Sequence, residues 1–251
     1  MTALDWEGCL NVRDLGGLPT ADGRTTLHGA VIRSDNVGDL TEHGWRSLAE
    51  HGVVRIVDLR WAVERVGEGP PPVAVEVVQI PLLGDSLDEE YLTELNASLD
   101  SSDDVADHYA WSYVDFLERF RDRFGLALAA VAEVEGTVVV HCAGGKDRTG
   151  LISALLLRLA GVDRVVIAAD YALSEDNLAP NGPAWIDGVD DELERGRRRK
   201  LMQTPAEAML QTLDELERRY GAVDEYLRRA GLDDGQIDQL RERLVDRSRK
   251  R

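Results

Sequence analysis

A cysteine and an arginine are separated by five residues in the segment His141-Cys142-Ala143-Gly144-Gly145-Lys146-Asp147-Arg148-Thr149-Gly150. The thiolate is the reactive form of cysteine, and arginine offers a planar fork of donors that holds two oxygens of a phosphate at once. The two glycines allow consecutive backbone amides to turn toward an anion, because no Cβ obstructs them. These residue types at this spacing predict a phosphate-binding loop that carries its own nucleophile.

The segments around this loop indicate how it is positioned. Thr137–His141 is short and mostly apolar, which predicts a buried strand, and Leu151–Ala160 predicts a buried helix that stops at Gly161. Anions bind where a strand leads into a helix N-terminus, at the carboxyl edge of an α/β sheet. We therefore expect phosphate to be held by Ala143, Gly144, Gly145, Lys146, Asp147 and Arg148, with His141 and Thr149 in support.

The predicted chemistry is an in-line attack of Cys142 on phosphorus, which needs no metal ion and no other cofactor. The electropositive loop favours the thiolate, and Thr149 is placed to donate its hydroxyl to that sulfur when it leaves in a second step. The amides and Arg148 would stabilise the equatorial oxygens of the transition state. A single free cysteine is more often a small buried apolar residue, but the complete loop argues against that interpretation.

An ATP-binding Walker A loop is excluded by the residue register. That motif needs a glycine at its first position and a serine or threonine directly after its lysine. Aligned on Lys146, the chain has Val140 at the first position and Asp147 after the lysine.

His-Cys, five residues and Arg-Thr-Gly together resemble the signature of the protein tyrosine phosphatase superfamily. The full string HCAGGKDRTG is similar to bacterial tyrosine and lipid phosphatases of the mycobacterial protein tyrosine phosphatase B type. The likeness extends to Asn11–Gly17, Arg33–Asp35, Asp58–Arg60 and the residues around Tyr220 and Tyr226. It implies that Cys142 is the nucleophile and Arg148 the phosphate clamp, in a sheet of four or five strands flanked by helices, with a helical segment that could act as a lid.

The leaving group of a phosphomonoester needs a proton donor. The resemblance favours Asp147 within the loop, where bound phosphate would raise the pKa of the carboxyl group and Arg148 would oppose that rise. Upstream alternatives are Asp85, Asp103, Asp104 and Asp107, although each of these is also typical of a solvated acidic surface.

Other residues have weaker signals. Lys146 is one of only three lysines, and the resemblance links this position to phosphoinositide activity; the alternative is a solvent-facing charge. Arg13, Asp14 and Arg60 are expected to give structural support. Cys9 is expected to be a bystander, and the basic run 195–200 a solvated helix face. Trp61, Trp111 and Trp185 are assigned to the core or the pocket wall, without a choice between them.

Composition narrows the possible partners. The chain has 251 residues and a formal net charge of −18, from 29 Lys and Arg against 47 Asp and Glu. That charge argues against nucleic acid, whose binding needs a basic surface. No apolar run approaches a membrane span, and no secretory signal is visible. We expect one domain over 1–251, with a helical part at about 185–250, and a cytoplasmic location, with leaderless export left open. The oligomeric state is not predicted.

The remaining pattern predicts an α/β fold with a mostly parallel sheet. Strands are expected at Ala30–Arg33, Val53–Leu59 and Val73–Ile80, and helices at about 40–51 and within 87–135. Asp39 and Glu42 are taken as a capping box for the first of these helices. The predicted substrate is a phosphorylated protein, first phosphotyrosine, with phosphoserine, phosphothreonine or phosphoinositide as further options. Alternatives are a soluble phosphoester such as a nucleotide or sugar phosphate, an inactive phosphate-binding module, or a sulfur-transfer or arsenate-reducing enzyme.

Overall fold

The computed structural model describes residues 2–86 and 88–245, which include a six-stranded sheet with the order β1-β2-β3-β6-β4-β5. The strands are β1 (Thr2–Ala3), β2 (Arg13–Asp14), β3 (Val31–Ser34), β4 (Val53–Asp58), β5 (Glu76–Gln79) and β6 (Thr137–His141). The last four are mutually parallel, whereas β1 and β2 add a short antiparallel edge. The predicted α/β class and mostly parallel sheet are confirmed.

Strand β6 lies in the centre, between β3 and β4. All five of its residues are buried, because helices or loops cover both faces of the sheet. Ser34 of β3 and Asp58 of β4 are both paired with His141 in the strand register. The carboxyl ends of three parallel strands therefore meet at the point where the chain leaves β6 for the loop.

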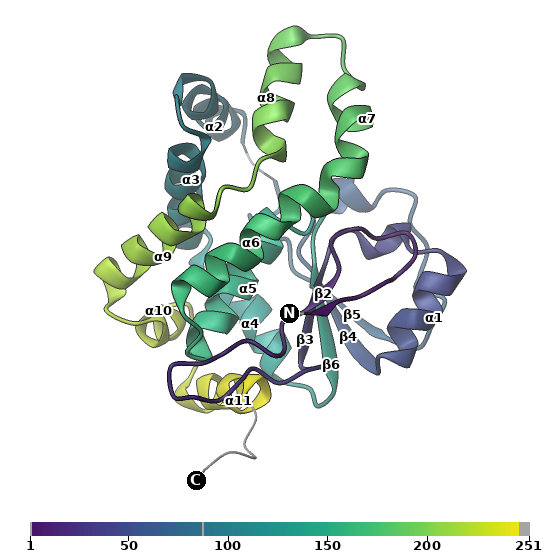
Figure 1. Cartoon of the computed structure of the whole chain (residues 1–251), viewed down its shortest axis with the longest axis vertical. Coiled ribbons are helices and arrows are strands. Elements are labelled where there is room, and N and C mark those ends of the chain that lie inside the picture. The colour runs from purple at the N-terminus through teal and green to yellow at the C-terminus, as the bar shows by residue number, and fades with distance from the viewer. Residues whose placement is uncertain (1, 87, 246–251) are drawn as a thin grey trace.

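Helices lie on both faces of the sheet (Figure 1). One face packs against α3 (Val105–Arg119), α4 (Arg121–Ala132), α5 (Asp147–Leu159), α6 (Arg164–Leu178), α9 (Ala206–Tyr220), α10 (Val223–Arg229) and α11 (Asp234–Leu244) in one large apolar core. The other face is covered by α1 (Glu42–Glu50) and the N-terminal segment around Trp6. Successive strand residues alternate between the two cores, as the pleat requires: Val138 and Val140 join the first and Val139 the second.

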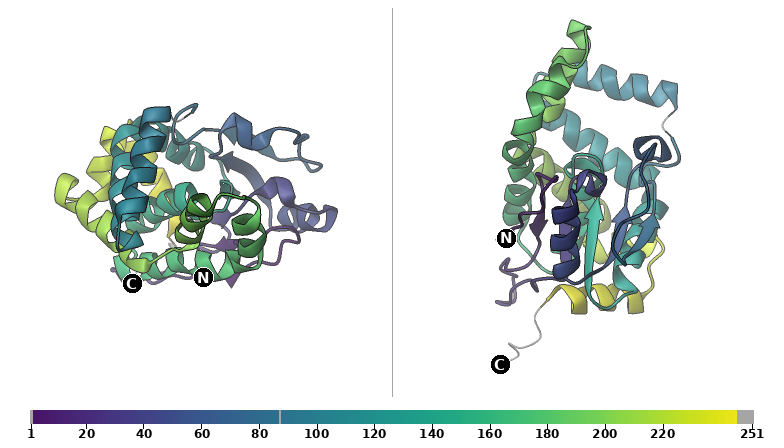
Figure 2. Two further views of the ribbon diagram at one scale, coloured as in Figure 1. Left: turned by 90° about the horizontal axis from the view of Figure 1, so that it is seen from above. Right: turned by 90° about the vertical axis from the view of Figure 1, so that its right-hand side faces the viewer.

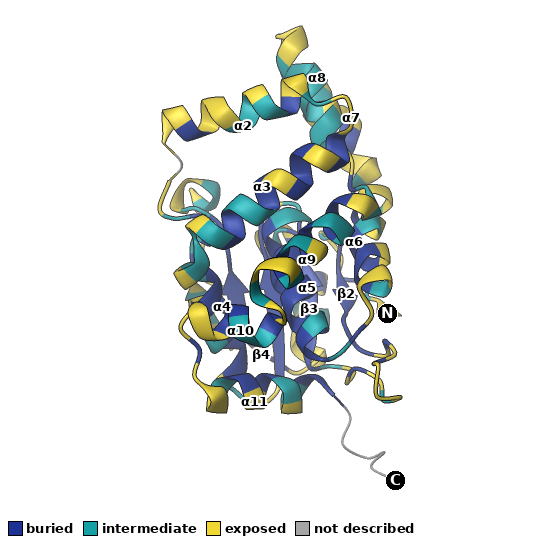
Figure 3. Ribbon diagram, turned by 90° about the vertical axis from the view of Figure 1, so that its left-hand side faces the viewer, coloured by how far each residue is buried: buried dark blue, intermediate teal, exposed yellow. Residues whose placement is uncertain are grey.

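Two helices project beyond the sheet. Helices α7 (Gly182–Asp187) and α8 (Glu192–Met202) extend from the end of α6 and form the tip of the molecule in two views (Figures 1 and 2). Helix α2 (Glu89–Ser101) lies beside α8, where Arg197 pairs with Asp100. Much of α2 is exposed, whereas α5 and the strands β2, β3, β4 and β6 are mostly buried (Figure 3). No helix in the described part of the chain is both long and apolar enough to cross a membrane.

Local details differ from the sequence-based expectations. The first helix begins at Glu42 and is capped by Thr41, whose hydroxyl accepts from the Gly44 amide, so the capping box assigned to Asp39 is wrong. Asp39 instead ends a 3₁₀ turn, η1 (Val37–Asp39). The segment Asn11–Gly17 contains β2, and the strand expected at Val73–Ile80 is shortened to β5. The ranges 87–135 and 185–250 include residues 87 and 246–250, which lie outside the described residues.

Helix α5 begins four residues earlier than predicted, at Asp147. Its polar first turn has no apolar periodicity, so the sequence pattern detects only the buried remainder. Asp147, Arg148 and Thr149 therefore belong to the N-terminal turn of a helix, where backbone amides lack helical acceptors and attract anions.

Candidate active site

The loop between β6 and α5 is held by its carbonyl oxygens. The Ala143 carbonyl accepts from the Asn36 amide at 2.9 Å, and the Gly144 carbonyl accepts from Asn11 Nδ2 at 3.0 Å. The Gly145 carbonyl accepts from Arg33 Nη2 at 2.6 Å. All three carbonyls are thus engaged by the protein around the outside of the loop.

This arrangement fixes the direction of the amides. In a trans peptide the N–H of the next residue points opposite to the carbonyl. The N–H groups that follow these carbonyls, on Gly144, Gly145 and Lys146, therefore point away from the protein scaffold and into the loop. In residues 2–86 and 88–245 they donate to no protein acceptor. A ring of unused, inward-facing amides is the arrangement that binds an oxyanion.

Gly145 is required by the loop geometry. Its φ is +66°, in the left-handed region, and a Cβ there would lie 2.5 Å from the Ser34 carbonyl oxygen. Gly144 has no such constraint, since a Cβ would contact Leu178 at an ordinary 3.6 Å. Of the two glycines expected to matter, only Gly145 is indispensable on steric grounds.

Cys142 lies at the base of the loop, with its side chain in the helix-covered core. The preceding residue, His141, points to the opposite face, where its Nε2 lies 3.6 Å from Asp58. Burial lowers the pKa of His141 to about 4, against the opposing charge of Asp58, so the imidazole is neutral at physiological pH. Positive charge near Cys142 therefore comes from other residues.

Arg148 is the main source of that charge. Its guanidinium forms two hydrogen bonds with the carboxylate of Glu64, at 2.6 and 2.7 Å, and lies 4.7 Å from the ring centroid of Trp61. Trp61 and Glu64 belong to one short segment, the 3₁₀ turn η2 (Ala62–Arg65) and its N-cap. Because the carboxylate and the ring fix the fork in two directions, Arg148 is oriented before any ligand binds.

Electrostatics connect this arginine with the cysteine. Burial opposes the charged form of Arg148, but its hydrogen bonds to Glu64 and the negative charge of Cys142 raise the pKa of the guanidinium overall. The sulfur and the guanidinium are therefore close enough to interact.

Asp147 and Lys146 are held together by tyrosines of α3. Lys146 Nζ donates to Tyr109 Oη and to Asp147 Oδ1, each at 2.8 Å. Tyr113 Oη donates to the same Asp147 oxygen at 2.5 Å and lies 2.8 Å from Tyr171 Oη. The Lys146 side chain is only 12 % exposed, so it is not the solvent-facing charge that the sequence left as an alternative.

These contacts stabilise the ionised carboxylate. Burial alone would raise the pKa of Asp147, but the charge and hydrogen bond of Lys146, the Tyr113 hydroxyl and the charge of Arg148 together lower it. Without substrate Asp147 is therefore ionised at neutral pH. A phosphate dianion placed in the loop would shift its pKa upward.

A buried ionic network anchors the loop to α6. Asp170, on α6, accepts hydrogen bonds from both Arg33 and Arg13. All three side chains are at most 2 % exposed. Since Arg33 also donates to the Gly145 carbonyl, the loop conformation depends on a carboxylate that is distant in sequence. Removing either partner would leave an unpaired buried charge, which is strongly destabilising.

The upstream acids are arranged differently from Asp147. Asp85 is 87 % exposed and pairs with Arg123, while the Asp104 carboxylate caps the N-terminus of α3. Asp103 is exposed, and Asp107 lies on the exposed side of α3, where it accepts from Gln211. None of these four contacts the loop in the described structure.

The remaining predicted residues have mainly structural contacts. Thr149 is buried, and its hydroxyl has no hydrogen-bond partner in the described part of the chain. Arg60 binds Asp58 and Glu68, and the Asp14 carboxylate accepts from the Gly16 and Gly29 amides.

Cys9 donates its thiol to the Asn36 carbonyl. Burial and the nearby carboxylate of Asp35 raise the pKa of this thiol, so Cys9 stays protonated. Trp111 and Trp185 are about 40 % exposed, at 39 % and 42 %, which leaves Trp61 as the tryptophan beside Arg148. The basic residues of α8 contact either α2 or acidic residues near them in the sequence; they are Arg195, Arg197, Arg198, Arg199 and Lys200.

The sequence did not identify several residues that contribute to the site. Glu64 lies in a loop rich in charges and has no distinguishing local pattern. Tyr109 and Tyr113 are four residues apart on α3, a spacing that places both on one face, but the same spacing is typical of residues that only pack in a core. Asp170 occurs within a helix and has no local signal other than its apolar neighbours.

Within residues 2–86 and 88–245, no cluster of three or more His, Cys, Asp or Glu side chains is arranged to hold a metal ion. The loop instead offers amides, Arg148 and a sulfur atom. Amides and a guanidinium are suited to binding an anion, and a thiolate is suited to attacking one.

Comparison with known proteins gives a consistent set of relatives. A sequence model described as "Tyrosine phosphatase family" matches residues 4–246. The chain is 30 % identical to a tyrosine-protein phosphatase of Nostoc commune, over 86 % of this chain and 74 % of that protein. It is 29 % identical to the triple specificity protein phosphatase PtpB of Mycobacterium tuberculosis, over 96 % and 98 % of the two chains. A putative tyrosine-protein phosphatase of Cupriavidus necator is 30 % identical, over 88 % and 81 %.

Proposed function

The chain belongs to the tyrosine phosphatase family, whose members are cysteine-dependent phosphatases, and we propose that it hydrolyses phosphotyrosine in proteins through a phosphocysteine intermediate on Cys142. The observation that carries this proposal is the loop itself: inward-facing amides and a pre-oriented Arg148 surround the cysteine at the end of β6. We take residues 1–251 as one phosphatase domain.

In the first step the Cys142 sulfur attacks phosphorus opposite the ester oxygen. The S–P bond forms as the P–O bond to the tyrosyl oxygen breaks, and Asp147 gives its proton to that oxygen. The amides and Arg148 hold the equatorial oxygens, where charge accumulates in the transition state. The bound phosphate dianion raises the pKa of Asp147, because it disfavours a second negative charge nearby. Asp147 is therefore protonated when substrate is in the loop.

In the second step water attacks the phosphocysteine. Asp147, now ionised, takes a proton from the water, and the S–P bond breaks to release inorganic phosphate and the thiolate. The hydroxyl of Thr149, which has no other partner in the described residues, is the donor proposed to stabilise that thiolate. The cycle consumes one water and needs no external oxidant, reductant or metal.

The direct test is hydrolysis of 4-nitrophenyl phosphate in the presence of EDTA. We expect turnover that chelation does not change, and a rapid burst of nitrophenolate equal to the enzyme concentration if breakdown of the phosphocysteine is rate-limiting. Loss of activity on chelation would contradict the mechanism. Acid quenching during turnover, followed by mass spectrometry of the peptide that contains Cys142, should detect the covalent phosphate.

Substrate class needs a separate measurement. A panel of phosphotyrosine, phosphoserine and phosphothreonine peptides, phosphoinositide vesicles and soluble nucleotide or sugar phosphates should be compared by kcat/KM. We expect the phosphotyrosine peptide to give the highest value. The name of the Mycobacterium tuberculosis relative and the position of Lys146 are the reasons for including the phosphoserine, phosphothreonine and phosphoinositide substrates. A nucleotide or sugar phosphate that surpasses every peptide would favour the soluble-metabolite alternative.

Replacing Asp147 with Asn should affect poor leaving groups most. General acid catalysis contributes about 10²–10⁴-fold, and its contribution falls as the leaving group becomes a better anion. We expect kcat/KM for phenyl phosphate to fall by about 10²-fold or more and kcat/KM for 4-nitrophenyl phosphate to fall much less, because kcat/KM does not include the later breakdown of the phosphocysteine. Asp85→Asn is the matched control at an exposed upstream acid and should change neither value. If Asp85→Asn has the expected effect and Asp147→Asn has none, the general acid is Asp85.

Removing the Tyr113 hydroxyl should shift the pH profile. That hydroxyl stabilises the Asp147 carboxylate, so Tyr113→Phe raises the pKa of Asp147. Activity requires protonated Asp147 and is lost as pH rises through that pKa; a raised pKa therefore moves the alkaline limb of kcat to higher pH, by roughly one unit. Tyr109→Phe, which loses a contact with Lys146 instead, is the matched control. If the alkaline limb of the kcat–pH profile stays in place in Tyr113→Phe, the Tyr113 hydroxyl does not contribute to acid catalysis.

A further inference from the structure

A cavity of about 620 Å³ lies on the face of the sheet opposite to the Cys142 side chain. Its floor includes Ile56 on β4 and Val77 on β5, which alternate along their strands with residues that face the large helix-covered core. No residue of the phosphate loop from Cys142 to Arg148 lines it. The volume is in the range that suits a small organic ligand, about 300–1,000 Å³.

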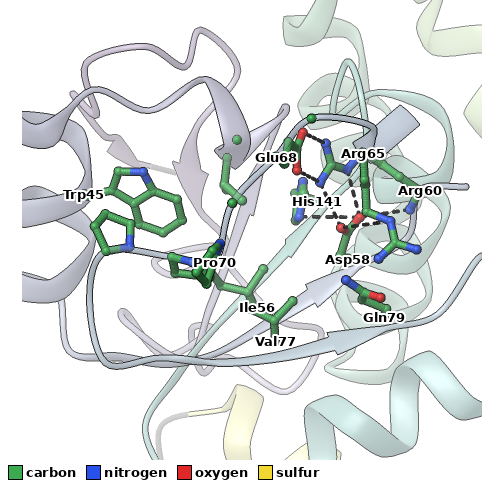
Figure 4. Close-up of a pocket in the computed structure, with 16 residues that line it drawn as sticks. Trp45, Ile56, Asp58, Arg60, Arg65, Glu68, Pro70, Val77, Gln79 and His141 are labelled. Atoms are coloured by element: carbon green, nitrogen blue, oxygen red, sulfur yellow. Dashed lines mark hydrogen bonds and ion pairs between the residues drawn. The ribbon is translucent and has the colours of Figure 1, made fainter. Parts of the chain in front are cut away.

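The two ends of the cavity differ in chemistry (Figure 4). Trp45 from α1 and the proline segment 70–72 form an apolar end, and Ile56 and Val77 lie between the two ends. The opposite end is lined by charged or polar side chains: Asp58, Arg60, Arg65, Glu68, Gln79 and His141. A ligand that fills this space needs an apolar body and one polar head.

The charged end contains one arginine, Arg65, whose side chain donates no hydrogen bond within the described residues. Arg60 is saturated by Asp58, Glu68 and Asn36. Arg65 is only 16 % exposed, yet in the described part of the chain its guanidinium forms no hydrogen bond, and its nearest carboxylate, that of Asp58, is 4.0 Å away. Buried polar groups in folded proteins nearly always have a partner, so Arg65 is suited to an acceptor from outside the chain.

The surrounding charges restrict the type of acceptor. Asp58 and Glu68 line the same end, and their negative charges disfavour a dianion such as a phosphate ester. His141 is neutral at physiological pH and adds no compensating charge. A carboxylate carries one charge and two oxygens that match the planar guanidinium.

We propose that this cavity binds a small monocarboxylate with an apolar body, whose head pairs with Arg65 and whose body lies against Trp45, Ile56 and Val77. The site is distinct from the phosphate loop. Arg65 directly follows Glu64 in η2, so the ligand head and the clamp on Arg148 share one four-residue element.

The test is a calorimetric titration of the full-length protein with 2-naphthoate. We expect saturable binding that persists when inorganic phosphate saturates the catalytic loop. The neutral analogue 2-naphthalenemethanol should bind at least about tenfold more weakly, because it keeps the aromatic body but cannot form a charge-assisted pair with Arg65.

Two variants in the cavity and one control locate the binding. Arg65→Gln should weaken binding of 2-naphthoate about tenfold, whereas Arg229→Gln, at an exposed arginine of α10, should leave it unchanged. Val77→Phe fills the cavity and should abolish binding. This second test does not depend on whether Arg65→Gln folds. Equal affinity for Val77→Phe and the unmodified protein, displacement by phosphate, or absence of saturable binding would each overturn the proposal. Because the readout is binding, such a result leaves the proposed hydrolysis unaffected.

Discussion

Replacing Cys142 with Ser is expected to reduce kcat for 4-nitrophenyl phosphate by at least about 10⁴-fold, the scale on which loss of a nucleophile affects covalent catalysis. A serine hydroxyl is almost entirely protonated at neutral pH, so it cannot attack phosphorus at a comparable rate. The amides of residues 144–146 and Arg148 are unchanged by this substitution, and they are the groups that we propose bind the phosphate. The variant should therefore bind substrate without consuming it.

The measurement pairs steady-state kinetics with the dissociation constant for a phosphotyrosine peptide. Cys9→Ser is the matched control, because Cys9 is the other cysteine of the chain and its thiol is held protonated by burial. We expect the control to retain full activity. Activity in Cys142→Ser within tenfold of the unmodified enzyme would refute the phosphocysteine mechanism, whatever the behaviour of Cys9→Ser.

Replacing Arg148 with Lys should cost about 10³-fold in kcat/KM even though the charge is kept. Arginines that stabilise transferring phosphoryl groups contribute about 10³–10⁵-fold. An ammonium group cannot make the two parallel hydrogen bonds that Glu64 now accepts, and it cannot bridge two phosphate oxygens with a fixed geometry. Both the pre-orientation and the clamp are therefore lost together.

Arg158→Lys provides the control for this change. Arg158 lies on the same helix, α5, and pairs with Glu217 away from the loop. We expect its kinetics to be unchanged and its melting temperature to be close to that of Arg148→Lys. A small kinetic effect in Arg148→Lys, with the affinity for inorganic phosphate unchanged, would show that charge alone is sufficient and that the Glu64 clamp has no catalytic consequence.

The sequence by itself determined the features that are contiguous along the chain. Thr137–His141 was predicted as a buried strand with the observed bounds, because a continuous apolar run followed by glycines has few other solutions. The phosphate loop could be identified for the same reason: its sulfur, amides and guanidinium lie within seven consecutive residues, Cys142 to Arg148. The start of α5 was missed because its first turn is polar and has no periodic signal.

Only the tertiary structure decided how these groups are held. Glu64 is 84 residues from Arg148, Tyr113 is 34 from Asp147, and Arg33 is 112 from Gly145. A carboxylate or a tyrosine has the same local pattern whether it faces solvent or a buried cation, so no local signal marks these partners. Their role follows from strand order: β6 lies between β3 and β4, which brings Arg33 on one side and the segment after Asp58 on the other against a loop that the chain reaches much later.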